Sequence, residues 1–75
     1  MIHTICVPNV SDYDITEVRG IASKILEHFL FDETEGTDAV DCHIAFIDTD
    51  GAKLDMLEDV LKKESWDFYE LGRYL

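Results

Sequence analysis

An alternating apolar segment in the middle of the chain constrains the fold most. From Ala39 to Ile47 every second residue is apolar, and this set comprises Val40, Cys42, Ile44 and Phe46. Because successive side chains of a strand point to opposite faces, the alternation predicts a strand with one buried face. The residues on the opposite face begin with the polar Asp41 and His43 and become apolar toward the end of the strand. This predicts that the second face is covered over that half of the strand more than over the other.

Two segments with helical spacing flank this strand. Apolar residues recur three or four positions apart from Ile15 to Leu30, which predicts an amphipathic helix of roughly four turns that ends near Phe31. A second helix is predicted from about Ala52 to Glu64 by the same spacing. Its inward residues are Leu54, Leu57, Val60 and Leu61. Candidate N-caps of the first helix are Ser11, Asp12 and Asp14.

Two shorter segments complete the predicted sheet. Ile2–Val7 is rich in β-branched residues and is followed by Pro8-Asn9, which predicts a short strand that ends there. Trp66–Leu75 alternates in a way that favours a strand, although its apolar residues also fit a helix. Asp32–Asp38 is predicted to be a turn, with Gly36 as its positive-φ residue.

The predicted order is β-α-β-α-β. It indicates one small α/β (α+β) domain over residues 1–75, with a three-stranded sheet and both helices packed on one face. The other face of the sheet is expected to be partly open.

The net charge narrows the class of partner. The chain has 17 acidic and 6 basic residues, for a formal charge of −11, whereas a magnitude of about 2–8 suffices to keep a small domain soluble. Such a surface repels nucleic acids and anionic membranes and attracts basic proteins. Since no segment has the pattern of a signal peptide or a membrane span, we expect a cytoplasmic protein.

The acidic residues are concentrated in one interval. No Lys or Arg occurs between Lys24 and Lys53. Acids at the end of the predicted first helix oppose the helix dipole, and a local rule broken without compensation points to a functional site. A solvated acidic loop is the alternative interpretation. The acids expected to contact a partner are Glu27, Asp32, Glu33, Glu35, Asp38 and Asp41.

The aromatic end of the chain supplies further candidate contacts. Trp66 and Phe68 are expected to complete the core, whereas Tyr69, Arg73 and Tyr74 have the composition of a binding hot spot.

Ala45–Asp55, AFIDTDGAKLD, resembles the first motif of haloacid-dehalogenase-type phosphatases, a hydrophobic strand followed by D-x-D-G-T. The resemblance implies that Asp48 would be the nucleophile and Asp50 the general acid, with Mg²⁺ between them. The sequence departs from the motif at Ala52, and the family's later motifs need a much larger sheet. We therefore interpret the segment as a strand-to-helix turn in which Asp50 is the N-cap.

The remaining reactive side chains lack the spacing of a catalytic or metal site. Cys42 and His43 are consecutive on a predicted strand and therefore point to opposite faces. We expect Cys6 and Cys42 to be reduced and buried, and the histidines to be partly exposed. No enzyme activity, metal or cofactor is predicted.

These observations predict a small acidic inhibitor or adaptor that blocks a basic, nucleic-acid-binding surface of a partner protein, as a nucleic-acid mimic. Inhibitors made by phages and mobile elements, including anti-CRISPR proteins, are similar in size and charge class. An alternative is a homodimerising or regulatory module that uses an edge strand or the open sheet face. A more distant alternative is a Mg²⁺-dependent phosphatase-like site at Asp48 and Asp50.

Overall fold

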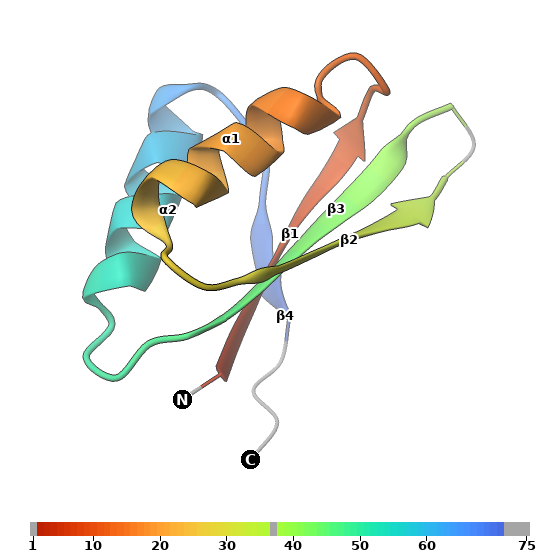
Figure 1. The fold of residues 1–75 in the computed structure, drawn as a ribbon. Helices are drawn as coiled ribbons and strands as arrows, with labels where there is room; N and C mark the ends of the chain where they lie inside the picture. The colour runs from red at the N-terminus through yellow and green to blue at the C-terminus, as the bar shows by residue number, and fades with distance from the viewer. Residues whose placement is uncertain (1, 37, 72–75) are drawn as a thin grey trace.

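Two helices cover one face of a four-stranded antiparallel sheet in the computed structural model, which describes residues 2–36 and 38–71 (Figure 1). The elements are β1 (Ile2–Val10), α1 (Ile15–Ile25), β2 (Leu30–Glu35), β3 (Val40–Ile47), α2 (Ala52–Lys63) and β4 (Tyr69–Leu71). The strand order is β2-β3-β1-β4. This βαββαβ arrangement, in which β3 lies between β1 and β2, is the split βαβ or ferredoxin-like topology.

The core lies between the helices and the inner face of the sheet. The predicted alternation of β3 is confirmed, because Cys42, Ile44 and Phe46 are buried while Ile47 is exposed. The inward residues predicted for α2, and those predicted for the first helix from Ile15 to Phe29, lie in the core or pack against it, whereas Leu30 at the end of that predicted helix is exposed. The fully buried apolar residues of the core are Ile5, Val7, Val10, Val18, Ala22, Cys42, Ile44, Leu57 and Leu61.

The strand β2 was not predicted, and the sheet therefore has four strands rather than three. The first helix ends at Ile25 and not near Phe31, because Leu26 adopts an extended backbone with ψ 131. The chain then pairs with β3 from Leu30 to Glu35, where the end of the predicted helix and most of the predicted turn would lie. Acidic residues are depleted in strands, but an edge strand tolerates them and charges there oppose pairing with other chains.

Gly36 is required for space and not for a positive φ. Its φ lies outside the left-handed region, and a Cβ atom at this position would be 2.7 Å from the carbonyl oxygen of Ala39. The Gly36 amide donates a hydrogen bond of 2.8 Å to that same oxygen. The prediction of a positive-φ glycine is therefore wrong at Gly36.

Strand β1 continues through Pro8-Asn9, where it was predicted to end. The pairing register with β3 shifts between Val7 and Val10, which marks a β-bulge. Asn9 has a φ of 57, a conformation that Asn tolerates better than most residues, and its amide donates to Asp41 Oδ1 at 3.1 Å. The bulge absorbs the two residues that interrupt the apolar pattern.

The end of the described chain forms the other edge of the sheet. The predicted strand over Trp66–Leu75 is present at Tyr69–Leu71, which pairs with β1. Trp66 and Phe68 pack against the core as predicted. Neither helix of the described residues has the length and apolar character to cross a membrane.

Candidate functional site

The outer face of the sheet, opposite the helices, changes from apolar to acidic along its strands. Residues paired across antiparallel strands share a face, so the register defines rows of side chains. One end carries Ile2 opposite Ile47. The next two rows cross all four strands, first as Leu30, Ala45, Thr4 and Leu71, and then as Asp32, His43, Cys6 and Tyr69.

A hollow of about 490 Å³ opens at the apolar end of this face. Its polar residues are Glu27 and His28, both in the connection between α1 and β2. We call it the apolar hollow. Its apolar lining consists of Ile2, Phe29, Leu30, Ala45, Phe46 and Ile47.

A second hollow, of about 320 Å³, lies at the opposite end of β2 and is here called the acidic hollow. Three carboxylates line it, from Asp12 after β1, Glu35 at the end of β2 and Asp38 before β3. Within residues 2–36 and 38–71, no basic side chain lies within 4.0 Å of these three carboxylates. The same part of the chain contains no group of His, Cys, Asp or Glu arranged to hold a metal ion.

The structure divides the predicted acidic contact set among different surfaces. Asp32 and Asp41 lie on the outer face, Glu27 lines the apolar hollow, and Glu35 and Asp38 line the acidic hollow. Because α1 ends at Ile25, Asp32 and Glu33 do not crowd a helix end, and the predicted dipole cost does not apply to them.

Glu33 is the exception to the predicted lack of basic neighbours. It faces the helices, and its Oε2 lies 3.8 Å from Nη2 of Arg19 on α1. The Arg19 guanidinium also lies over the ring of Phe31, 4.7 Å from its centroid. Packing of α1 across the sheet makes this contact, so Glu33 belongs to a solvent-exposed ion pair within the chain and does not have an unpaired carboxylate.

Tyr69 is exposed on the outer face, where it was predicted to contribute to binding. The Cys6 thiol, which lies opposite Tyr69 on β1, raises the pKa of the Tyr69 hydroxyl. Arg73 and Tyr74 lie outside the described residues. Cys6 and Cys42 are free and buried as predicted, and burial with the nearby Glu33 carboxylate raises the pKa of Cys42 to about 11.

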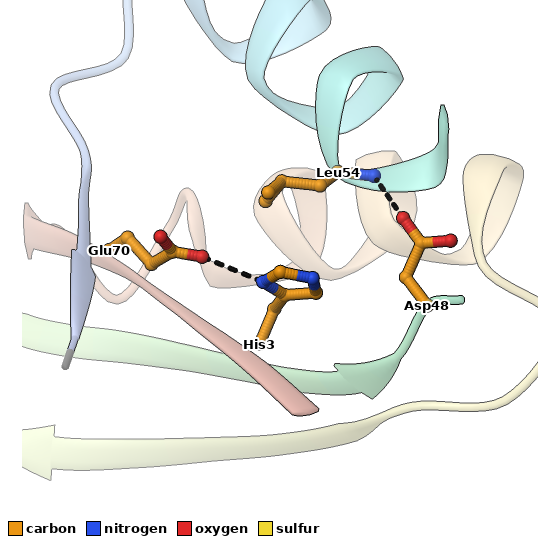
Figure 2. Close-up of polar contacts among 4 residues, drawn as sticks. All are labelled: His3, Asp48, Leu54 and Glu70. Atoms are coloured by element: carbon orange, nitrogen blue, oxygen red, sulfur yellow. Dashed lines mark hydrogen bonds and ion pairs between the residues drawn. The ribbon is translucent and has the colours of Figure 1, made fainter. Parts of the chain in front are cut away.

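The Asp-Thr-Asp-Gly segment caps α2. Asp48 Oδ2 accepts a hydrogen bond of 3.0 Å from the Leu54 amide (Figure 2), and Asp50 Oδ1 accepts one of 3.0 Å from the Ala52 amide. The N-cap residue itself is Gly51, with φ 81, and not Asp50 as predicted. Asp48 is only 6% exposed, and the Leu54 amide lowers its pKa below the ordinary value of 3.8. This geometry favours a capping role for both carboxylates.

Removing the Asp48 carboxylate is therefore expected to change how stability depends on pH. Because the folded pKa is lowered, the carboxylate stabilises the fold above pH 3.8, and this contribution is lost as the pH falls through the folded pKa. In thermal unfolding followed by circular dichroism, Asp48→Asn should show a smaller loss of stability on acidification than the parent. Asp48→Ala should also lose stability at neutral pH, as helices do without an N-terminal cap. An acid response identical to that of the control Asp59→Asn would contradict this assignment.

His3 and Glu70 form a polar contact on the helix-covered face of the sheet. His3 Nδ1 lies 2.8 Å from Glu70 Oε2 (Figure 2), and the His3 ring is tilted against Phe46 with centroids 5.6 Å apart. His3 is only 5% exposed, so the prediction of a partly exposed histidine is wrong at this position. His3 is buried because it points inward from β1, and Glu70 on the neighbouring β4 provides a hydrogen-bond partner for its ring nitrogen.

Sequence reasoning missed both hollows. The sequence predicts only a helix cap at Asp12, and only places in a strand and in a helix for Ile2 and Leu30. One signal was available in the sequence. The outward-facing residues of β3 change from polar to apolar by Ile47, which leaves a large aliphatic side chain on the uncovered face of the sheet.

Comparison with known proteins supports the fold. No protein-family profile matches the chain, and no curated protein matches its sequence. A solved structure, the solution structure of the PlyG cell wall binding domain, is similar with a TM-score of 0.64 and 20% identity. The match covers 88% of this chain and 74% of that one. This chain therefore shares its small α+β architecture, with two helices on an antiparallel sheet, with that domain.

Proposed function

We propose that this protein is a small acidic binding module that docks onto a basic surface of a partner protein. The acidic hollow carries the proposal, because three carboxylates from separate segments converge there without a basic neighbour within 4.0 Å in the described part of the chain. Lys or Arg side chains of a partner would neutralise them. Charge and surface shape support this function, whereas the similarity to the PlyG domain concerns the fold alone.

Competition with nucleic acid follows from the same charges. A formal charge of −11 steers the protein toward basic surfaces over a Debye length of about 8–10 Å at moderate salt. A basic surface occupied by these carboxylates no longer attracts phosphates. We therefore propose an inhibitor or adaptor whose most specific form is a nucleic-acid mimic, directed against a nucleic-acid-binding or nucleic-acid-processing protein.

Neutralising the acidic hollow is expected to weaken binding to a basic probe. In fluorescence anisotropy with a labelled arginine-rich peptide, the variant Asp12→Asn/Glu35→Gln/Asp38→Asn should bind about tenfold more weakly than the parent, because the lost pairs are charge-assisted. Binding of the parent should weaken as NaCl is raised from about 50 to about 300 mM.

A matched control separates this site from the total charge. Asp59→Asn/Glu64→Gln/Asp67→Asn removes the same number of exposed carboxylates from α2 and the segment that follows it. It should weaken peptide binding much less than the hollow variant. If both variants lost the same amount of affinity for the peptide, the effect would be one of net charge and not of this site. An unchanged affinity of the hollow variant would reject the proposed site.

Self-association through the outer face is a second candidate function, favoured by the apolar end of that face. Ile2, Leu30 and Ile47 are large apolar residues that remain exposed there. Sedimentation of the isolated protein tests it, since a homodimer that is insensitive to salt would support a dimerisation or regulatory module.

A further inference from the structure

Three large aliphatic side chains remain in water at one corner of the sheet. Ile2 is 59% exposed, Leu30 75% and Ile47 74%. They come from three different strands but are neighbours, because Ile2 pairs with Ile47 and Leu30 lies opposite Ala45 in the next row. Exposed apolar residues that are scattered singly are ordinary, whereas a contiguous group marks a contact surface.

The corner is hollowed rather than flat. The apolar hollow has a volume of about 490 Å³, within the range of roughly 300–1,000 Å³ that is common for ligand pockets. Its lining includes Phe46, which is buried in the core, and Leu30 and Ile47, whose side chains are exposed. A concave apolar site of this kind accepts a large hydrophobic side chain, which is the usual anchor of a protein interface.

The acidic residues near the apolar hollow favour a partner segment that is basic. Glu27 lines the hollow, and Asp32 follows Leu30 on the same outer face of β2. Leu30 and Glu35 begin and end β2 and belong to the apolar and the acidic hollow respectively. These two side chains are five positions apart and point to opposite faces of the sheet. Six residues of strand span about 17–20 Å, so a short extended segment that lies along the edge strand β2, with side chains that also alternate between the two faces, can reach both hollows.

We propose that the apolar hollow anchors one large apolar side chain of a partner segment that carries Lys or Arg a few residues away. This inference rests on the proposed function, because it assigns the second contact of the same basic partner. A second copy of this chain fits the corner less well, since each copy carries a charge of −11 and the adjoining edge strand β2 is acidic.

Two peptide probes test the anchor. Both carry the same pair of arginines, and they differ only in a residue placed about a strand's length away, which is Trp in one and Ala in the other. The parent protein should bind the Trp peptide about tenfold more tightly, the gain expected of a buried aromatic anchor. In the variant Leu30→Thr/Ile47→Thr this ratio should fall to about one, whereas Met56→Gln, which removes an exposed apolar residue from α2, should preserve it.

The acidic-hollow variant makes the two proposals separable. Asp12→Asn/Glu35→Gln/Asp38→Asn should weaken both peptides and keep the preference for Trp. A ratio near one in the parent, with binding that still depends on salt, would overturn the anchor and leave the proposed function standing. Binding of neither peptide in a salt-dependent manner would reject the proposed function itself.

Two further measurements keep the inference testable if a variant misfolds. In amide chemical-shift mapping of the parent, the Trp peptide should shift Leu30, Ala45 and Ile47, and the Ala peptide should not. Shifts confined to other residues would overturn the anchor. A parent that sediments as a dimer, and that becomes monomeric in Leu30→Thr/Ile47→Thr, would show that a second copy occupies the hollow.

Discussion

Replacing Leu61 with Ala is expected to leave most of the protein unfolded. Leu61 on α2 is completely buried in the core between the helices and the sheet. Truncating a buried Leu costs about 2–5 kcal/mol, which combines lost burial with the cavity that remains. A single core in a domain of this size rarely supplies more than about 3–5 kcal/mol, so the loss is comparable to the whole stability.

Urea unfolding followed by circular dichroism and by the fluorescence of Trp66 measures this loss. The control is Met56→Ala on the same helix, which removes an exposed side chain and should change stability by about 0.5 kcal/mol or less. If Leu61→Ala unfolded at nearly the urea concentration of the parent, the assignment of Leu61 to the core would be wrong.

Removing the Glu70 side chain is expected to produce the second largest effect. Glu70→Ala leaves the buried ring of His3 without its 2.8 Å partner. An unsatisfied buried polar group costs about 1–3 kcal/mol. Glu70→Gln should retain much of the stability, because its amide oxygen can accept a hydrogen bond from the imidazole.

The double variant His3→Leu/Glu70→Ala provides the internal control. Replacing both partners with apolar groups removes the unsatisfied nitrogen, so the double variant should be more stable than Glu70→Ala alone. Hydrogen exchange should place the loss locally, with faster exchange of the β1 amides paired to β4, near Thr4 and Cys6. Additive losses of stability in the two single variants, or unchanged exchange of these β1 amides, would contradict the assigned role of the pair.

The elements with a clean apolar period were predictable from the sequence. β3 and α2 fall within a residue of their predicted bounds, because Cys42, Ile44 and Leu57 follow the periods of a strand and a helix. β2 was not predictable by the same logic. Its acids have low strand propensity, and only pairing with β3, which is a tertiary contact, makes Leu30–Glu35 a strand.

The candidate surfaces were less predictable than the elements. The acidic interval was visible in the sequence as a run of residues. Asp32 and Glu33 point to opposite faces of the sheet because they are consecutive on a strand, and this segment was predicted to be a turn. The apolar hollow brings together Ile2, Leu30 and Ile47, which lie far apart in the chain. Strand order and register decide such neighbours, and local periodicity carries no information about either.

Strand β1 lies in the interior of the sheet, so the two hollows form during folding only through contacts between distant parts of the chain. β1 pairs with β3 on one side and with β4 on the other, and the His3–Glu70 contact joins residues 67 positions apart. Contacts this distant in the chain raise the contact order, which slows folding. Each hollow combines residues of β2 and β3 with a residue of β1 or of the segment just after it, so both hollows need β1, β2 and β3 to be assembled. Partner binding should therefore track the folding of these three strands together rather than the folding of any one segment.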